Sequence, residues 1–345
     1  MESLPVPSVQ AMVAASSGAE VPSRYHRPEA SHDPVANDIE AEIPVIDFQK
    51  LLDPDASPED SARLHRACQD WGFFQLINHG VPSDVVEGMK ASTEGFFQLP
   101  LETKKEVAQE RGQLDGYGHL FVVSEDQKLD WSDVLYLNTR PPHRKNLRFW
   151  PDRPDNFRLT LEKYSAATMN IVERLLPIIA KNLELQPEAL TDKFVDGIQS
   201  IRMNYYPACV KAENVVGLAP HSDAGFLTLV LQVNQVQGLQ IRRNGTWVPV
   251  KPLDSAFVVN LGDTFEIFTN GRYKSIEHRA VVDTEKERLS IAAFHGPNMH
   301  AKIGPLKDIV AHEVEAYKTV DHENFRRLFL SGRLVGKSFL EQMKL

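Results

Sequence analysis

Cysteine and long apolar runs are scarce in this chain of 345 residues. The two cysteines, Cys68 and Cys209, lie far apart in the sequence, which excludes a disulfide-stapled secreted scaffold and indicates a reducing compartment. No apolar run is long enough to span a bilayer. Residues 1–23 lack the basic start and the continuous apolar stretch of a secretory signal. We therefore expect a cytoplasmic protein, and a nuclear fraction is left open.

Blocks of basic residues are also absent, and the formal net charge is -9. Nucleic acids and anionic membranes are bound through concentrated Lys/Arg surfaces, so neither is expected as a partner. The hydrophobic content of 42% is sufficient for a large core in a chain of this length. The composition therefore predicts a globular protein with small-molecule partners, and we expect a monomer.

Apolar residues recur at helical spacing in the first half of the chain. The segment from Ser57 to Asp60 combines an N-cap, a proline in the first turn and an acid, and it predicts a helix that ends at Gly72. Apolar residues at spacings of three and four between Leu161 and Ile178 predict a long helix with one apolar face. The pattern becomes helical again from Ala311.

Between these helical regions, from about Ile198, the apolar period is two, as in a β-strand. Asn-Gly pairs at 244–245 and 270–271 predict two-residue hairpin turns. Many short antiparallel strands without intervening helices indicate a jelly roll or a barrel. The predicted fold class is mainly β, with helical N-terminal and C-terminal regions.

His221 and Asp223 carry side chains that commonly bind metals. On an extended strand, residues two apart point to the same face, so one pocket can receive both. His278 adds a second imidazole from a distant strand. Two histidines and one carboxylate on one side of a metal suit non-haem Fe(II), which keeps positions open for a co-substrate and oxygen. Asp263 follows a Leu-Gly pair and is interpreted as a turn residue rather than a fourth ligand.

A second site, for an acid, is predicted from Arg288 and Ser290, which have the same spacing of two. The guanidinium offers a planar fork of donors and the serine a short hydroxyl. Together they can hold one carboxylate of a dicarboxylate such as 2-oxoglutarate. Tyr206 and Asn204 alternate onto one face of another predicted strand, and either can hydrogen-bond the same acid.

Seven motifs follow one another along nearly the whole chain: Ile43–Asp47, Trp71–Pro82, Asn204–Pro207, His221–Asp223, Asn260–Asp263, Asn270–Arg279 and Arg288–Ser290. In this order they resemble the plant-type 2-oxoglutarate- and Fe(II)-dependent dioxygenases. That group includes anthocyanidin synthase, flavonol synthase, and the norcoclaurine-synthase-like and senescence-related proteins. Ser222 is a departure, because the family commonly has threonine between its first two ligands.

This resemblance implies a double-stranded β-helix, which is a jelly roll, buttressed by helices. It implies Fe(II) as the metal, 2-oxoglutarate and O₂ as co-substrates, and ascorbate as a supporting reductant. It also implies four regions: an N-terminal arm (1–42), a mostly helical dioxygenase region (43–195), the Fe(II)/2-oxoglutarate jelly-roll core (196–310) and a C-terminal helical lid (311–345).

The organic substrate is predicted to be a small aromatic or heterocyclic plant metabolite, such as a flavonoid, indole, alkaloid or phenolic. Phe294 shares the strand face of Arg288 and Ser290, so its ring should face the site. Arg202, on the face of Asn204, instead indicates an acidic group on the substrate. The resemblance adds residues that border the substrate in similar enzymes: Trp131, Val134, Tyr136, Phe325 and Phe329.

The predicted site leaves the outcome of the reaction open. Hydroxylation, demethylation of a methoxy group and desaturation all accompany the release of succinate and CO₂. Two alternatives also remain, namely an oxidase of the same fold that does not use 2-oxoglutarate, and a catalytically silent small-ligand-binding protein. The complete ligand set and the complete acid clamp weigh against the silent protein.

Overall fold

The computed structural model describes residues 4, 6–16, 20–28, 33–36, 42–53, 57–119, 122, 124–331 and 336–345. Its larger sheet has eight strands in the order β1-β2-β10-β7-β12-β5-β4-β3, antiparallel except for the pair β1–β2. The strands are β1 (Val45–Asp47), β2 (Phe73–Ile77), β3 (Gly116–Gly118), β4 (Asp133–Arg140), β5 (Ile198–Tyr206), β7 (Leu227–Gln232), β10 (Phe257–Leu261) and β12 (Arg288–Gly296).

A smaller sheet of four strands has the order β6-β11-β8-β9. Its strands are β6 (Leu218–His221), β8 (Leu239–Arg243), β9 (Thr246–Pro249) and β11 (His278–Ala280), and a separate pair is formed by β13 (Lys302–Ile303) and β14 (Val320–Asp321). Together the two main sheets form the predicted jelly roll.

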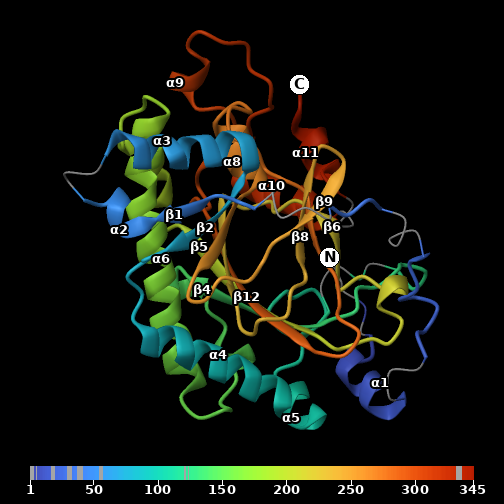
Figure 1. The fold of residues 1–345 in the computed structure, drawn as a ribbon. Coiled ribbons are helices and arrows are strands. Elements are labelled where there is room, and N and C mark those ends of the chain that lie inside the picture. The colour runs from blue at the N-terminus through green and yellow to red at the C-terminus, as the bar shows by residue number, and fades with distance from the viewer. Residues whose placement is uncertain are drawn as a thin grey trace.

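Helices flank the strands at both ends of the chain. They are α1 (Val9–Ser16), α2 (Phe48–Leu51), α3 (Pro58–Arg66), α4 (Ser83–Gln98), α5 (Leu101–Lys105), α6 (Phe157–Asn182), α7 (Glu188–Thr191), α8 (Asp263–Phe268), α9 (Lys307–Val310), α10 (His322–Ser331) and α11 (Ser338–Met343). The long helix α6 runs along one side of the molecule, with α3 and α4 beside it (Figure 1). No helix within the described ranges has the length and apolar character needed to cross a membrane.

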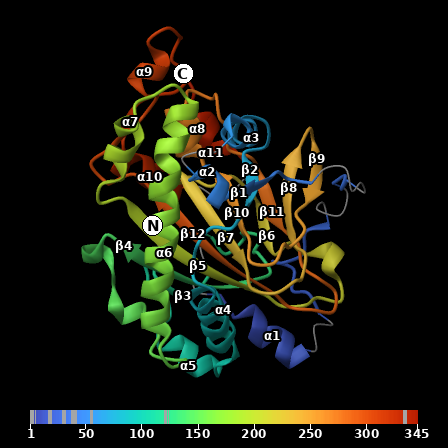
Figure 2. The same ribbon diagram turned by 60° about the vertical axis from the view of Figure 1, so that its left-hand side comes forward.

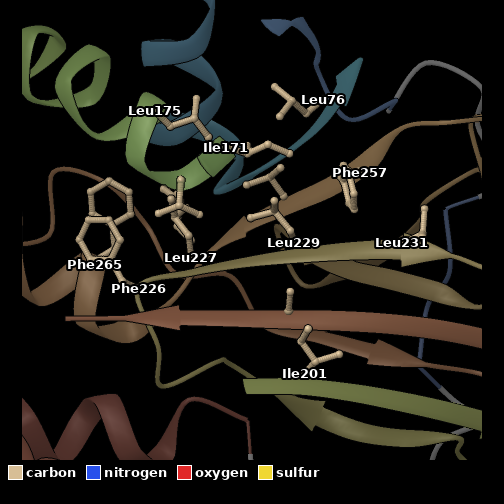
Figure 3. Close-up of a cluster of buried hydrophobic side chains, with 14 of the residues drawn as sticks. Leu76, Ile171, Leu175, Ile201, Phe226, Leu227, Leu229, Leu231, Phe257 and Phe265 are labelled. Atoms are coloured by element: carbon tan, nitrogen blue, oxygen red, sulfur yellow. The ribbon is translucent and has the colours of Figure 1, made fainter. Parts of the chain in front are cut away.

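The main core lies between the large sheet and α6. Alternate residues of β7, Leu227, Leu229 and Leu231, are buried, and Figure 3 shows them on the same side of the sheet as Ile171 and Leu175 of α6. Burying each such side chain contributes roughly 1.5–3 kcal/mol. Because side chains alternate along a strand, the intervening residues of β7 face the opposite side, toward the smaller sheet. Figure 2 shows that smaller sheet on the side away from α6.

The predicted helix that ends at Gly72 is confirmed. Ser57 caps α3 by accepting a hydrogen bond from the Glu59 amide, and the helix continues as a π-helical turn (Ala67–Trp71). Gly72 then adopts φ +59°, and a Cβ at this position would lie 2.2 Å from the carbonyl oxygen of Lys274. Only glycine fits both constraints, so the chain can turn directly from the helix into β2.

Only one of the two predicted hairpins forms. Asn244 and Gly245 connect the paired strands β8 and β9 with φ values of +50° and +82°. Asn270 and Gly271 have nearly the same φ values, but they follow α8 and lead into a loop, so the hairpin predicted there is wrong. Left-handed backbone can end a helix as well as join two strands. The expectation that no helix interrupts the strands is also wrong, because α8 lies between β10 and β11.

The N-terminal segment is attached to the sheet through Asp133 of β4. This carboxylate accepts hydrogen bonds from the Ser8 hydroxyl (2.7 Å) and from the Val9 and Gln10 amides (2.9 and 3.0 Å) at the start of α1. It therefore stabilises the amino end of a helix that lies far from it in the sequence. The four predicted regions stay a prediction, although β1 to β4 from residues 43–195 extend the same sheet as the later strands.

Candidate active site

A cavity opens between the two sheets and below α10. It contains about 1360 Å³ of space, including its open mouth, and its walls come from β5, β7 and β12 of the large sheet, β6, β8 and β11 of the small sheet, and α10. Such a concave space, largely apolar and lined by a few convergent polar side chains, is typical of a small-molecule site.

Three ligand-type side chains meet at the wall formed by the small sheet. His221 lies at the end of β6, directly opposite His278 of β11, and the centroids of their rings are 4.3 Å apart. Asp223 Oδ1 lies 3.5 Å from His221 Nε2 and 3.7 Å from His278 Nε2. All three side chains are buried, and their ligand atoms lie within 4.8 Å of one another, which is close enough to share one metal ion.

The surroundings hold each ligand in a metal-binding orientation. The Nδ1 atoms of His221 and His278 lie 2.8 and 3.1 Å from the Ala219 and Ile276 carbonyl oxygens, so Nδ1–H donates and Nε2 is directed to the centre. Asp223 is held in the same way, because its Oδ2 accepts from Thr228 Oγ1 (2.6 Å) and Asn260 Nδ2 (2.8 Å). Because both donors bind Oδ2, the other oxygen, Oδ1, faces the two histidines. The period-two pattern places Thr228 on this face, but nothing in the sequence assigns Asn260 to it.

The protonation states also suit a metal. Burial alone would raise the pKa of Asp223, but the charges that His278 and His221 carry when protonated bring that pKa well below its usual range. Burial, with a smaller contribution from His221, lowers the pKa of His278 to about 4. Near neutral pH the carboxylate is charged and His278 is neutral, as metal coordination requires.

Arg288 begins β12 and is only 2% exposed. Its Nη2 donates to Gln232 Oε1 (3.3 Å), its guanidinium lies 5.3 Å from the Tyr206 ring centroid, and its Nε has no hydrogen-bond partner. Within the described ranges no carboxylate pairs with it, and Tyr206 is the ionisable side chain that influences it. A buried, unpaired guanidinium is unfavourable, so this cavity is suited to an anionic ligand.

The rest of the predicted acid clamp lies beside Arg288. Tyr206 is its direct partner across β5 and β12, and Asn204 is the partner of Ser290, with Asn204 Nδ2 donating to Ser290 Oγ (3.3 Å). Gly238 makes room for the clamp, because a Cβ there would lie 2.6 Å from Arg288 Cδ. Nothing in the sequence singles out this glycine.

The structure brings five of the seven predicted substrate residues to the cavity. Phe294, Arg202, Tyr136, Phe325 and Phe329 all line it, and the Tyr136 hydroxyl donates to Ser200 Oγ (2.7 Å).

Helix α10 adds three lining residues, His322, Arg326 and Leu330, that the sequence does not predict. Burial, together with the charges of Arg326 and Arg144, lowers the pKa of His322 to about 4. The mouth of the cavity therefore has a cationic side chain beside a neutral imidazole.

The other two predicted substrate residues, Trp131 and Val134, do not line this cavity. The Trp131 indole nitrogen donates to the Pro207 carbonyl (3.2 Å), and its ring packs edge-on against Tyr25, with centroids 5.3 Å apart. Val134 shares its strand face with Tyr136, but it borders a smaller, separate cavity next to Asp130. The N-terminal segment covers this end of β4, so both side chains pack inside the protein.

Asp263 lies behind the metal-binding group rather than within it. It is the first residue of α8, its amide donates to the Asp223 carbonyl (2.7 Å), and Ser222 Oγ donates to its Oδ2 (3.1 Å). Burial raises its pKa to about 7. Ser222 thus points away from the metal-binding group and toward this carboxyl.

Two family models match the chain in sequence order. Residues 43–154 match the non-haem dioxygenase in morphine synthesis N-terminal family, and residues 197–297 match the 2OG-Fe(II) oxygenase superfamily. The chain belongs to the 2OG-Fe(II) oxygenases. It is therefore a 2-oxoglutarate-dependent dioxygenase that uses Fe(II) and O₂, and the predicted family and cofactors are confirmed.

Individual proteins of known name are similar to this chain over nearly its full length. S-norcoclaurine synthase 1 of Coptis japonica is 49% identical over 344 residues, which cover 99% of this chain and 97% of that protein. Oxoglutarate-dependent flavonoid 7-O-demethylase 1 of Ocimum basilicum is 44% identical, covering 99% and 92%. A crystal structure of JOX2 in complex with 2OG, Fe and JA superimposes with a TM-score of 0.91 at 34% identity and covers 100% of both chains.

Proposed function

We propose that this dioxygenase oxidises a small aromatic or heterocyclic plant metabolite. In this proposal His221, Asp223 and His278 hold the Fe(II). The observation that carries it is one cavity that contains both a buried histidine–carboxylate group and a buried arginine without an acid partner. The first suits a metal with open positions, and the second suits the far carboxylate of 2-oxoglutarate.

The clamp residues position the co-substrate. Arg288 and Ser290 receive the distal carboxylate, Tyr206 assists through its hydroxyl, and Asn204 orients the serine hydroxyl. When bound, Fe(II) would supply the activation of O₂ by which one oxygen atom enters succinate, 2-oxoglutarate loses CO₂ and the second oxygen oxidises a C–H bond of the substrate. The protein's own part is to fix both molecules at the metal and to exclude water from between them.

The substrate class is inferred from the lining at the other end of the cavity. Phe294, Phe325 and Phe329 present aromatic surface there, and Leu330 of α10 adds aliphatic surface. Flat aromatic or heterocyclic molecules match such walls. The flavonoid demethylase named above and codeine O-demethylase of Papaver somniferum, 42% identical, also support this class.

The test is a substrate-consumption screen by mass spectrometry over aromatic and heterocyclic plant metabolites, with Fe(II), 2-oxoglutarate and O₂ supplied. We expect one metabolite to gain oxygen, lose a methyl group as formaldehyde, or lose two hydrogens. Each product molecule should be matched by one succinate. A product formed without 2-oxoglutarate would instead show a same-fold oxidase, and no succinate under any condition would contradict the proposed function.

We further propose that the enzyme acts as a cytoplasmic monomer. The two buried free cysteines suit a reducing compartment. The net charge of -9 does not favour binding to nucleic acid or to an anionic membrane. Light scattering should give a mass near 38.9 kDa. A mass of twice that value would contradict the monomer.

A further inference from the structure

Arg202 lies on the same cavity wall as the acid clamp, but at a different level. Along β5, Tyr206 is paired with Arg288 at the clamp, whereas Arg202 is paired with Ala292 of β12 and Tyr136 of β4. Four residues of extended strand separate Tyr206 from Arg202, which places their Cα atoms roughly 13 Å apart. The Arg202–Ala292 pair is two residues along the ladder from the Ser200–Phe294 pair, where the organic substrate is proposed to lie.

The Arg202 guanidinium is buried without a hydrogen-bonded acid. Arg202 lines both this cavity and the smaller one next to Asp130, the residue is 7% exposed, and its Nε has no hydrogen-bond partner. The carboxylate that interacts electrostatically with Arg202 is Asp130. It already accepts hydrogen bonds from Arg27 Nη2 (3.3 Å) and from the Ala219 amide (3.1 Å). Asp130 is thus shared by two guanidinium groups, and among the described residues no acid forms a hydrogen-bonded ion pair with Arg202.

The co-substrate does not supply the missing negative charge. In the proposed function, the charges of Fe(II) and Arg288 are cancelled by those of Asp223 and of doubly charged 2-oxoglutarate. Arg202 is left over as a buried cation in a mostly apolar part of the cavity, beside Ala292 and Val230. An unpaired buried charge is strongly unfavourable, so the natural complement is an anion that enters with the organic substrate.

We propose that the organic substrate carries a carboxylate and that Arg202 binds it. This inference rests on the proposed function and narrows its substrate class to an aromatic or heterocyclic carboxylic acid. A carboxylate matches the planar fork of a guanidinium, which a neutral ester or amide cannot do with equal strength. Holding the acid at Arg202 leaves the apolar body of the molecule between Phe294 and the metal-binding group.

The experiment uses two probes of nearly equal shape, 1-naphthylacetate and 1-naphthylacetamide. Their binding to the anaerobic enzyme with Fe(II) and 2-oxoglutarate is measured by isothermal titration calorimetry. We expect the acid to bind tenfold to a hundredfold more tightly than the amide, as for a charge-assisted hydrogen-bonded pair. Arg202→Gln should abolish this difference, and Arg202→Lys, which keeps the charge without the fork, should give an intermediate value.

The matched control is Arg327→Gln, which removes the same charge from the exposed side of α10 and should preserve the difference. Circular dichroism and thermal unfolding establish that each variant is folded. Equal affinity of the wild type for the two probes, including failure to bind either, overturns the carboxylate proposal. So does a full acid preference in folded Arg202→Gln.

Failure of the proposed function is recognised separately on the wild type. The affinity for 2-oxoglutarate and the slow release of succinate without any organic ligand do not require an acid at Arg202. If both are observed while the probes are not distinguished, only the carboxylate proposal is wrong. If 2-oxoglutarate neither binds nor yields succinate, the proposed function is wrong as well.

Discussion

The two ends of the cavity wall are built in different ways. At the clamp end, Arg288 and Ser290 are paired with Tyr206 and Asn204 in one continuous strand ladder. At the substrate end, the wall is completed by α10, which comes from the far end of the chain and carries Phe325 and Phe329. In the proposed function the co-substrate is therefore held by regular sheet, whereas the substrate end of the cavity depends on a helix from another part of the chain.

The attachments of α10 illustrate this difference. His322 Nδ1 donates to the Asn298 carbonyl (2.9 Å), and the Phe325 ring packs edge-on against Phe339 of α11, with centroids 4.9 Å apart. Strands β5 and β12, by contrast, are paired over nine consecutive residues. A helix held by a few contacts opens more easily than a central strand, so substrate entry should occur by movement of α10.

The largest expected effect comes from the metal group, on which both ends of the cavity depend. His278→Ala removes one of the two imidazoles, so bound iron and succinate production should both be lost. Metal analysis and a succinate assay measure this on the same sample. The control, His312→Ala, removes an exposed histidine and should behave as the wild type. A folded His278→Ala enzyme that kept both iron and succinate production would disprove the assignment.

The second prediction tests the clamp end alone. Arg288→Lys keeps the charge but loses the planar fork, so the KM for 2-oxoglutarate should rise roughly tenfold to a hundredfold. The KM for the organic substrate should change far less. Arg327→Lys, on the exposed side of α10, serves as the control. An unchanged KM for 2-oxoglutarate would exclude Arg288 as the clamp, even if overall activity fell.

The third prediction concerns the carboxylate ligand. Thr228→Val removes the hydroxyl that donates to Asp223 Oδ2 while keeping a similar shape. Loss of such an outer contact should lower the affinity for Fe(II) by about tenfold. Competition with a coloured chelator measures it, and Thr246→Val in the β8–β9 hairpin is the control. If iron affinity is unchanged in Thr228→Val, Asn260 alone orients the carboxylate.

The fourth prediction tests the substrate end. Phe294→Ala removes aromatic surface beside the metal-binding group, so the KM for the organic substrate should rise roughly threefold to tenfold. More 2-oxoglutarate should be decarboxylated per product formed, because a loosely held substrate is oxidised less efficiently. Leu328→Ala on α10, where Leu328 is 43% exposed, is the control. A fully coupled reaction at the wild-type rate in Phe294→Ala would contradict this reading of the pocket.

The smallest expected effect is a pH dependence of stability at His322 of α10. Burial lowers the pKa of His322 from 6.5 to about 4, so the unfolded chain takes up a proton below pH 6.5 that the folded chain refuses until about pH 4. Stability from this group is therefore complete above pH 6.5 and is lost as pH falls through that window, by on the order of 2 kcal/mol at pH 5.

In His322→Gln this contribution is absent. Calorimetry at pH 7.5 and pH 5 should show that the variant loses less Tm on acidification than the wild type does, by a few degrees. Equal losses in the two proteins would show that His322 is not the titrating group.

The strands made the clamp end predictable from the sequence. A spacing of two places His221 with Asp223 and Arg288 with Ser290 on common faces, whatever the rest of the fold does. The helix that ends at Gly72 could also be predicted, because the N-cap Ser57 and the terminating Gly72 are both local sequence signals.

Elsewhere the same local signal fits two structures, or the decisive contact is distant. Asn-Gly at 270–271 has the backbone of a hairpin turn but ends a helix. The sequence around Trp131 does not predict its contact with Tyr25, and the sequence around His322 does not predict that α10 covers the cavity. Such contacts depend on packing between segments far apart in the chain, which periodicity does not report.

The packing of the N-terminal segment on later strands determines when it can dock during synthesis. The ribosome produces Val9 and Tyr25 first, yet they pack in a cluster that also contains Ala280 and Val282. At roughly 5–20 residues per second, these apolar side chains wait on the order of tens of seconds for their partners. This segment is therefore made well before the strands on which it packs, and it docks only once they have been made.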